Sequence, residues 1–98
     1  MCGIWFYLGQ RGVHDSQYLS TCHQHLQRRG PDRQCIHFLT CGQFELTLAF
    51  YRLSIMDLST NGDQPFIHTY VDADERQHDV YLMCNGEIYN YQFLVDKY

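Results

Sequence analysis

The sequence lacks a long apolar run, and no segment approaches the roughly 20 apolar residues that a membrane-spanning helix needs. Residues 1–9 carry neither the basic start nor the apolar stretch of a secretory signal peptide, so we expect a cytoplasmic protein with no membrane partner. Runs of basic residues are also missing, and the formal net charge is -4 at pH 7. The charge therefore argues against binding to a nucleic acid or to an anionic membrane surface.

Internal repeats and low-complexity segments are absent too. Of the 98 residues, 45% are hydrophobic and 15% are aromatic, which is typical of a globular domain rather than of a disordered chain. This length allows one domain with a modest core. The cysteines number 5, an odd count, and in a reducing compartment we expect thiols rather than disulfides. We interpret Cys22, Cys35, Cys41 and Cys84 as small hydrophobic residues.

The first half of the chain predicts a strand followed by a helix. Large apolar side chains alternate along residues 4–8, which is typical of a strand with both faces covered. Asp15 or Ser16 is a candidate N-cap for a helix that stops at Gly30 and Pro31. The apolar stripe of that helix consists of Leu19, Cys22 and Leu26.

The remaining pattern predicts more strands than helices. Two strands are expected over residues 34–39 and 44–51, joined by a tight hairpin. A long connection over residues 57–79 leads to a short strand at 80–83, and a helical pattern begins at Tyr91. We therefore expect an α+β fold with a mostly antiparallel sheet. So few helices cannot cover both faces of such a sheet.

Cys2 is the first candidate catalytic residue. Initiator methionine is normally removed when the next residue is small, and removal of Met1 would leave Cys2 with a free α-amine beside its thiol. An α-amine is basic enough near neutral pH to activate its own thiol, directly or through a water molecule. Considered alone, however, Cys2 is more often an ordinary second residue.

Residues elsewhere in the chain supply the other parts that an acyl-transfer site requires. The Asn85 amide and the Gly86 N–H suit an oxyanion hole, although the same pair is common in plain turns. Arg52 can bind the α-carboxylate of a free amino acid through two hydrogen bonds, and Glu87 can bind its α-ammonium group. In isolation, Arg52 and Glu87 would more often be ordinary surface residues.

Several short strings occur together in the order and spacing of one protein family. They are MCGI at 1–4, RGPD at 29–32, RLSIMDLS at 52–59 followed by QP at 64–65, and NGEIYN at 85–90. Together they resemble the glutaminase domain of glutamine-hydrolysing asparagine synthetase, a class II glutamine amidotransferase of the N-terminal-nucleophile hydrolase superfamily. The resemblance runs from Met1 to at least Tyr91. The RGPD and NGEIYN strings favour this branch, including relatives that amidate other carboxylates, over the class II enzymes that make glucosamine phosphate or phosphoribosylamine.

The resemblance implies a reaction and a role for each matching residue. Cys2 would attack the side-chain amide of L-glutamine, ammonia would leave, and water would hydrolyse the glutamyl thioester to glutamate. Asn85 and Gly86 would stabilise the oxyanion, Arg52 would hold the glutamine carboxylate and Glu87 would contact its amino group. The backbone that lines the pocket would be that of Leu53, Ser54, Ile55 and Met56. The implied fold is an αββα sandwich of antiparallel sheets.

The chain departs from this family by what it does not contain. Residues 1–98 include neither the family's Gly-Ser-Asp element, whose aspartate also binds the substrate ammonium, nor the second half of the sandwich. We therefore interpret residues 1–98 as a partial glutamine amidotransferase type 2 domain, incomplete at the C-terminal side and without a synthetase domain. We expect no cofactor in this chain, because ATP and Mg²⁺ belong to the synthetase domain. We also expect the chain to be marginally folded alone or to need a companion chain carrying the missing parts.

Two other interpretations remain open. Cys22, His23 and His25 suggest a metal site, with His14 or His37 as further ligands, but no second ligand pair has the spacing that completes a tetrahedron, so we expect no metal. The more serious alternative is a catalytically silent, truncated fragment that acts as a binding or regulatory module.

Overall fold

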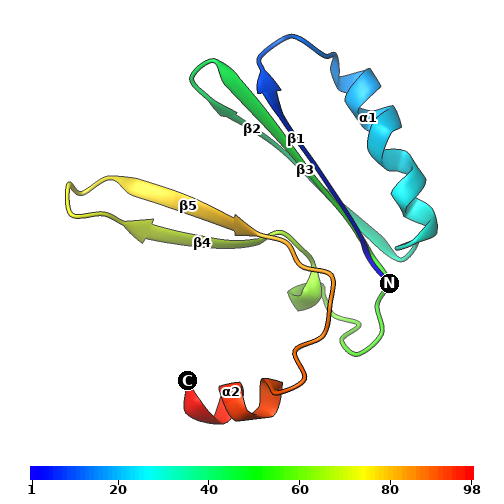
Figure 1. The fold of residues 1–98 in the computed structure, drawn as a ribbon, viewed down its shortest axis with the longest axis vertical. Helices are drawn as coiled ribbons and strands as arrows, with labels where there is room; N and C mark the ends of the chain where they lie inside the picture. Colours follow the sequence, from blue (N-terminus) through cyan, green and yellow to red (C-terminus); the bar gives the residue numbers. More distant parts are fainter.

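The computed structural model describes residues 1–98 and contains two antiparallel sheets, a helix that covers the larger sheet and a second helix that stands apart from both (Figure 1). The mixed helix and strand architecture with antiparallel sheets that the sequence predicts is confirmed. Short 3₁₀ turns at His25–Arg28 and Thr60–Gly62 complete the secondary structure. In chain order, the strands and α-helices are β1 (Gly3–Gln10), α1 (Ser16–Gln24), β2 (Arg33–Cys41), β3 (Phe44–Arg52), β4 (Phe66–Val71), β5 (Gln77–Leu82) and α2 (Tyr91–Lys97).

The larger sheet has the order β1-β3-β2 and contains most of the core. β2 and β3 are joined by the expected tight hairpin, in which Gly42 has a φ of 57°, a value that glycine adopts without strain. The central strand β3 is buried on both faces toward its end, from Thr47 to Arg52. The core therefore lies along β3, next to the point where the chain leaves the sheet.

Helix α1 covers one face of this sheet, and its start is as predicted. The Asp15 carboxylate accepts the Tyr18 N–H at 2.6 Å, which is the N-cap arrangement that satisfies a free backbone donor. The predicted stripe was wrong in detail, since Cys22 is exposed and Leu26 is only half-buried. Leu19 is buried as predicted, and His23 is buried too, because the His23 Nδ1 pairs with the Tyr51 hydroxyl at 2.7 Å and turns that side of the helix onto the sheet.

The predicted helix end was also wrong, because α1 stops at Gln24 and the chain tightens into a 3₁₀ turn. Beyond that turn, Gly30 passes directly over the end of β3. A Cβ atom at this position would lie 2.1 Å from the Tyr51 carbonyl oxygen, so only glycine allows the approach.

The second sheet is a β4–β5 hairpin within the segment that we predicted to be a long connection. That prediction was wrong, and the strand expected at 80–83 is longer and begins at Gln77. Every residue of β4 is exposed, so the strand forms by backbone pairing with β5 rather than by burying one face. Without such burial, β4 has no alternating pattern by which the sequence would reveal it.

The hairpin lies on the opposite side of the larger sheet from α1 (Figure 1). The two sheets meet where the rings of His37 and Tyr81 pack edge to face with centroids 6.2 Å apart. On the face of β1 that points toward the hairpin, Phe6 remains 66% exposed and Leu8 63% exposed. The sheets are therefore splayed apart, and much apolar surface between them is uncovered.

Helix α2 follows the hairpin and has no buried residue. No helix in the structure is long and apolar enough to cross a membrane. The cysteines are all free thiols rather than disulfides, as expected; Cys35 is half-buried, whereas Cys22, Cys41 and Cys84 are exposed and do not pack as small hydrophobic residues.

Candidate active site

A cavity of about 700 Å³ opens beside the start of β1, and it gathers segments that lie far apart in the sequence. Its lining comes from the N-terminus, from the chain just after β3 and from the loop after β5. The cavity includes every site residue that the sequence predicted except Ser54, namely Cys2, Arg52, Leu53, Ile55, Met56, Asn85, Gly86 and Glu87. Met1, Asp57 and Tyr89 also line it, although the sequence did not single them out. In the sequence, Asp57 and Tyr89 were notable only as members of the matching strings, and Met1 only as the neighbour of Cys2.

Pairing between β1 and β3 sets the position of the Cys2 sulfur. Gly3 lies opposite Tyr51 in the register, which places Cys2 beside the chain that leaves β3. The Leu53 N–H donates to the Cys2 Sγ at 3.4 Å, and the Leu53 carbonyl oxygen lies 3.8 Å from the same sulfur. The thiol is half-buried, and Leu53, which follows the end of β3, holds it at the cavity.

The RGPD string at 29–32 ties these segments together. The Arg29 Nε donates to the Cys2 carbonyl oxygen at 3.3 Å, and the Asp32 carboxylate accepts the Ser54 N–H at 2.7 Å. Ser54 is therefore fixed from outside the cavity. The string supports both the chain at Cys2 and the wall of the cavity without lining the cavity itself.

Arg52 is the last residue of β3, and its side chain is only 7% exposed. The guanidinium donates to the backbone carbonyl oxygens of Asp57 and Ser59 and to the Asp63 carboxylate, the last at 2.9 Å. Three hydrogen bonds use at most three of its five N–H groups, so at least two donors remain for a ligand.

The predicted oxyanion loop follows β5 and is exposed at Asn85, Gly86 and Glu87. A Cβ atom added to Gly86 would meet nothing within 4 Å, so its backbone faces open space. The loop is anchored by Gln64, whose Oε1 accepts the Cys84 N–H at 2.6 Å. Sequence reasoning had noted Gln64 only as part of a string and had missed this contact.

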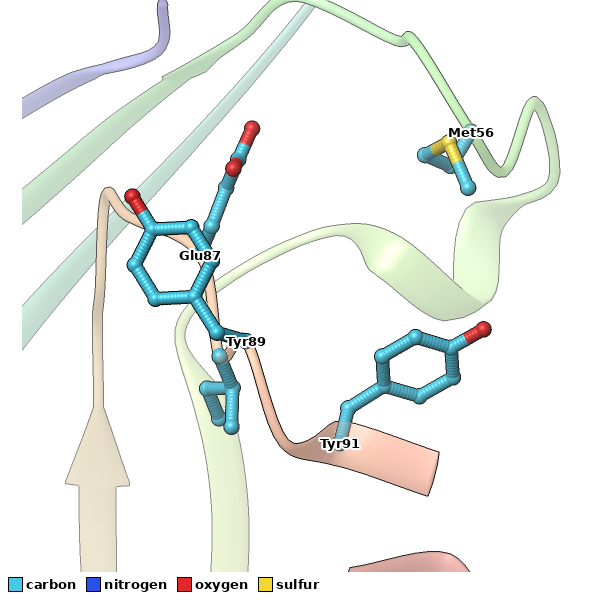
Figure 2. A pocket seen from close by; sticks show the side chains of 5 residues that line it. Met56, Glu87, Tyr89 and Tyr91 are labelled. Atoms are coloured by element: carbon cyan, nitrogen blue, oxygen red, sulfur yellow. The ribbon is translucent and has the colours of Figure 1, made fainter. Parts of the chain in front are cut away.

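A second cavity of about 540 Å³ adjoins the first and shares Met56, Glu87 and Tyr89 with it. Figure 2 shows Glu87 on the loop after β5 and, across the cavity, Met56 on the chain after β3. Met56 and Tyr89 are each 93% exposed, so this side of the site is open to solvent.

Charge near the site is concentrated in the 57–63 loop. Hydrogen bonds from the Ser59 hydroxyl and N–H, together with the nearby Arg52, hold the pKa of the Asp57 carboxyl below its ordinary value. In contrast, burial raises the pKa of the Cys35 thiol, and the Asp63 carboxylate adds to this effect. Cys35 is therefore a poor nucleophile and is not expected to compete with Cys2 for electrophiles.

The residues considered for a metal site are not brought together. His23 is buried and bonded to Tyr51, whereas Cys22 and His25 are exposed. No group of three or more His, Cys, Asp or Glu side chains is close enough to hold a metal ion.

The chain matches the family described as glutamine amidotransferase domain over residues 1–98. It belongs to this family. The resemblance to glutamine-hydrolysing asparagine synthetase inferred from the sequence strings is confirmed by individual relatives.

Three relatives illustrate how this glutamine amidotransferase domain compares with known proteins. A probable asparagine synthetase [glutamine-hydrolyzing] of Acanthamoeba polyphaga mimivirus is 37% identical over 99 residues, which is 100% of this chain and 16% of that protein. Asparagine synthetase [glutamine-hydrolyzing] 2 of Bacillus subtilis is 41% identical over 66 residues, 67% of this chain and 7% of the relative. The amidase chyE of Penicillium rubens is 32% identical over 110 residues, 99% of this chain and 15% of the relative. The chain thus spans a small part of each relative, and no solved structure gives a significant match.

Proposed function

We propose that this glutamine amidotransferase domain carries the nucleophile side of glutamine hydrolysis, the step that releases ammonia from L-glutamine. The observation that best supports the proposal is the cavity that brings the Cys2 sulfur together with Asn85, Gly86 and Arg52. An acyl-transfer site needs a nucleophile, oxyanion donors and a group that orients the substrate. Residues of each kind line the same space.

The reaction begins with Cys2 as the N-terminal residue, after removal of Met1. The free α-amine takes the thiol proton, and the sulfur attacks the side-chain carbonyl carbon of glutamine. The Asn85 amide and the Gly86 N–H donate to the oxyanion that forms. The proton then passes to the departing nitrogen, ammonia leaves, and a glutamyl thioester remains on Cys2. Water hydrolyses this thioester, which releases glutamate and restores the thiol.

The substrate is oriented by its two charged ends. The free donors of Arg52 bind the α-carboxylate, and Glu87 binds the α-ammonium group. The backbone of residues 53–56 forms the wall between them. Ser54 itself does not line the cavity, and its N–H donates to Asp32 instead.

We further propose that the two sheets belong to an αββα sandwich and that a companion chain covers their exposed apolar faces. The exposed Phe6 and Leu8 on the inner face of β1 support this, because large apolar surface is costly to leave in water. The companion would carry the rest of the glutaminase domain and the synthetase domain, where ATP and Mg²⁺ would bind. The relatives named as asparagine synthetases favour aspartate as the acceptor of the ammonia.

The decisive experiment compares two forms of the chain, one with Cys2 as the N-terminal residue and one with Met1 blocked against removal. We expect only the first to release glutamate and ammonia from L-glutamine and to be labelled at Cys2 by a chloroketone analogue of glutamine. Equal labelling of both forms would contradict the proposed role of the α-amine.

The alternative of a silent binding module is favoured by one observation, namely that Asn85, Gly86 and Glu87 are all exposed. An oxyanion loop that is not packed has no fixed geometry. A silent module predicts that the glutamine analogue labels Cys2 no faster than a simple alkylating agent does, after correction for their intrinsic reactivities.

A further inference from the structure

The Arg52 guanidinium is a buried cation. The proposed reaction accounts for the ligand that it binds but not for the charged side chains that lie next to it. A charge taken out of water is stable only when it is paired and hydrogen-bonded. The carboxylate that pairs with it is that of Asp63, with 2.9 Å between the Arg52 Nη1 and the Asp63 Oδ1. The Asp63 side chain is itself only 15% exposed, so solvent screens this pair weakly.

Asp63 also binds a second arginine. Its Oδ2 accepts from the Arg33 Nε at 2.8 Å. Arg33 and Arg52 lie directly opposite each other in the β2–β3 register, and like charges in that position repel. Asp63 bridges the two guanidinium groups, one oxygen to each, and removes the repulsion that would otherwise push Arg52 out of its place.

The loop that carries Asp63 closes tightly around the Arg52 guanidinium. The Asp63 N–H donates to the Thr60 carbonyl oxygen at 3.0 Å, which fixes the carboxylate at the end of a 3₁₀ turn. A Cβ atom added to Gly62 would lie 2.3 Å from the Arg52 Nη2, so a larger residue there would displace the guanidinium from its present position. The arrangement of Arg33, Asp63 and Arg52 keeps one net positive charge, which suits a ligand with a single carboxylate.

We propose that Asp63 is a positioning residue that bridges Arg33 and Arg52 and so directs the free Arg52 donors toward the α-carboxylate of the substrate. This inference rests on the proposed function, in which Arg52 binds that carboxylate. Asp63 does not touch the substrate, and its effect is confined to ligands that carry the carboxylate.

The test measures a carboxylate preference at Cys2 in the full chain with Met1 removed. Two probes are used, the chloroketone analogue of L-glutamine and the same chloroketone with its α-carboxylate converted into a carboxamide. In both cases the Cys2 sulfur displaces chloride, and mass spectrometry gives the labelling rate. The ratio of the two rates is the carboxylate preference.

We expect Asp63→Asn to lower the carboxylate preference by about tenfold to a hundredfold, the effect of misplacing a charged hydrogen-bond donor. The labelling rate with the carboxamide probe stays within about twofold of the rate measured for the wild-type chain. Asp63→Glu keeps the charge and restores part of the preference. Asp74→Asn is the matched control, because Asp74 is 71% exposed and pairs only loosely with Arg76 at 3.7 Å.

The outcomes separate this inference from the function on which it rests. If the unchanged chain shows no carboxylate preference, the proposed function is wrong. If it shows the preference and Asp63→Asn retains it, Asp63 has no positioning role while the function stands. If circular dichroism shows that Asp63→Asn is unfolded, Asp63→Glu replaces it, since it keeps the charge but moves the carboxylate away from its position between Arg33 and Arg52. We then expect a smaller fall in preference, and an unchanged preference would overturn the inference.

Discussion

The half of the chain that ends at Arg52 and the half that follows it differ sharply in packing. Of the 11 buried residues, all but Pro65 lie within residues 1–52, whereas every residue of β4 is exposed. Cys2 and Arg52 are attached to the packed half, and Asn85, Gly86 and Glu87 belong to the open half. The proposed nucleophile and the arginine proposed to bind the carboxylate are therefore held firmly, whereas the proposed oxyanion loop depends on a few contacts such as the one from Gln64.

The largest expected effect lies on the packed side, at Cys2, the proposed nucleophile. Cys2→Ala removes the sulfur that forms the thioester, so we expect glutamine hydrolysis to fall below about a thousandth of its original rate. The measurement is release of glutamate and ammonia from L-glutamine. Cys41→Ala, which changes an exposed thiol in the β2–β3 turn, serves as the control and leaves the rate unchanged.

A pair of phenylalanine substitutions tests the difference in packing directly. Phe50 in β3 is 1% exposed and Phe66 in β4 is 41% exposed. We expect Phe50→Ala to lower the free energy of unfolding by about 3–5 kcal/mol, because it empties a filled core site. Phe66→Ala lowers it by less than about 1 kcal/mol. Urea unfolding followed by Trp5 fluorescence gives both values, and equal losses would contradict the contrast between the halves.

Gln64→Ala tests whether the open half relies on its anchor. Without the hydrogen bond between the Gln64 Oε1 and the Cys84 N–H, the Asn85 and Gly86 donors are no longer held in position. We therefore expect labelling of Cys2 by the glutamine chloroketone to slow roughly tenfold. Labelling by iodoacetamide, which needs no oxyanion donor of this kind, is unchanged. Gln43→Ala in the β2–β3 turn is the matched control. A normal rate in Gln64→Ala would mean that the loop is held by other contacts.

The smallest expected effect is a pH dependence of stability that arises from His23 in the packed half. Burial lowers the pKa of His23 below its ordinary value of 6.5, and its neighbours Trp5 and Tyr51 are uncharged aromatic residues. Below pH 6.5 the unfolded chain binds a proton that the folded chain does not, so stability falls as the pH drops through this range and is fully present above it. His23→Gln should flatten this part of the curve of unfolding free energy against pH. His68→Gln, on the exposed strand β4, should leave it unchanged.

Sequence patterns predicted the packed half better than the open half, for a physical reason. A strand that buries side chains must show apolar residues at regular intervals, as residues 4–8 and 44–51 do. β4 buries none, so its pairing with β5 could not be inferred from such a pattern. The buried face of α1 was predicted at Leu19 but not at His23, a polar residue that lies there through a hydrogen bond to Tyr51.

In the candidate site too, the sequence predicted some of the residues and missed others. The matching strings named Cys2, Arg52 and the loop at 85–87, and the structure brings these residues to one cavity. Asp63 and Gln64 were not assigned roles, because each acts through a contact with a residue at a distance along the chain. No local sequence pattern indicates which arginine an aspartate will pair with in the folded chain.

The amino-acid sequence by itself determined the family, the nucleophile candidate and the strands of the packed sheet, because these follow from residue identity and from periodic burial. Only the tertiary structure decided that Asp63 bridges Arg33 and Arg52, that Gln64 anchors the loop after β5 and that the two sheets stand apart. Such features depend on distances between segments that are remote in the chain. These distances are set by how the sheets pack, which the order of residues alone does not specify.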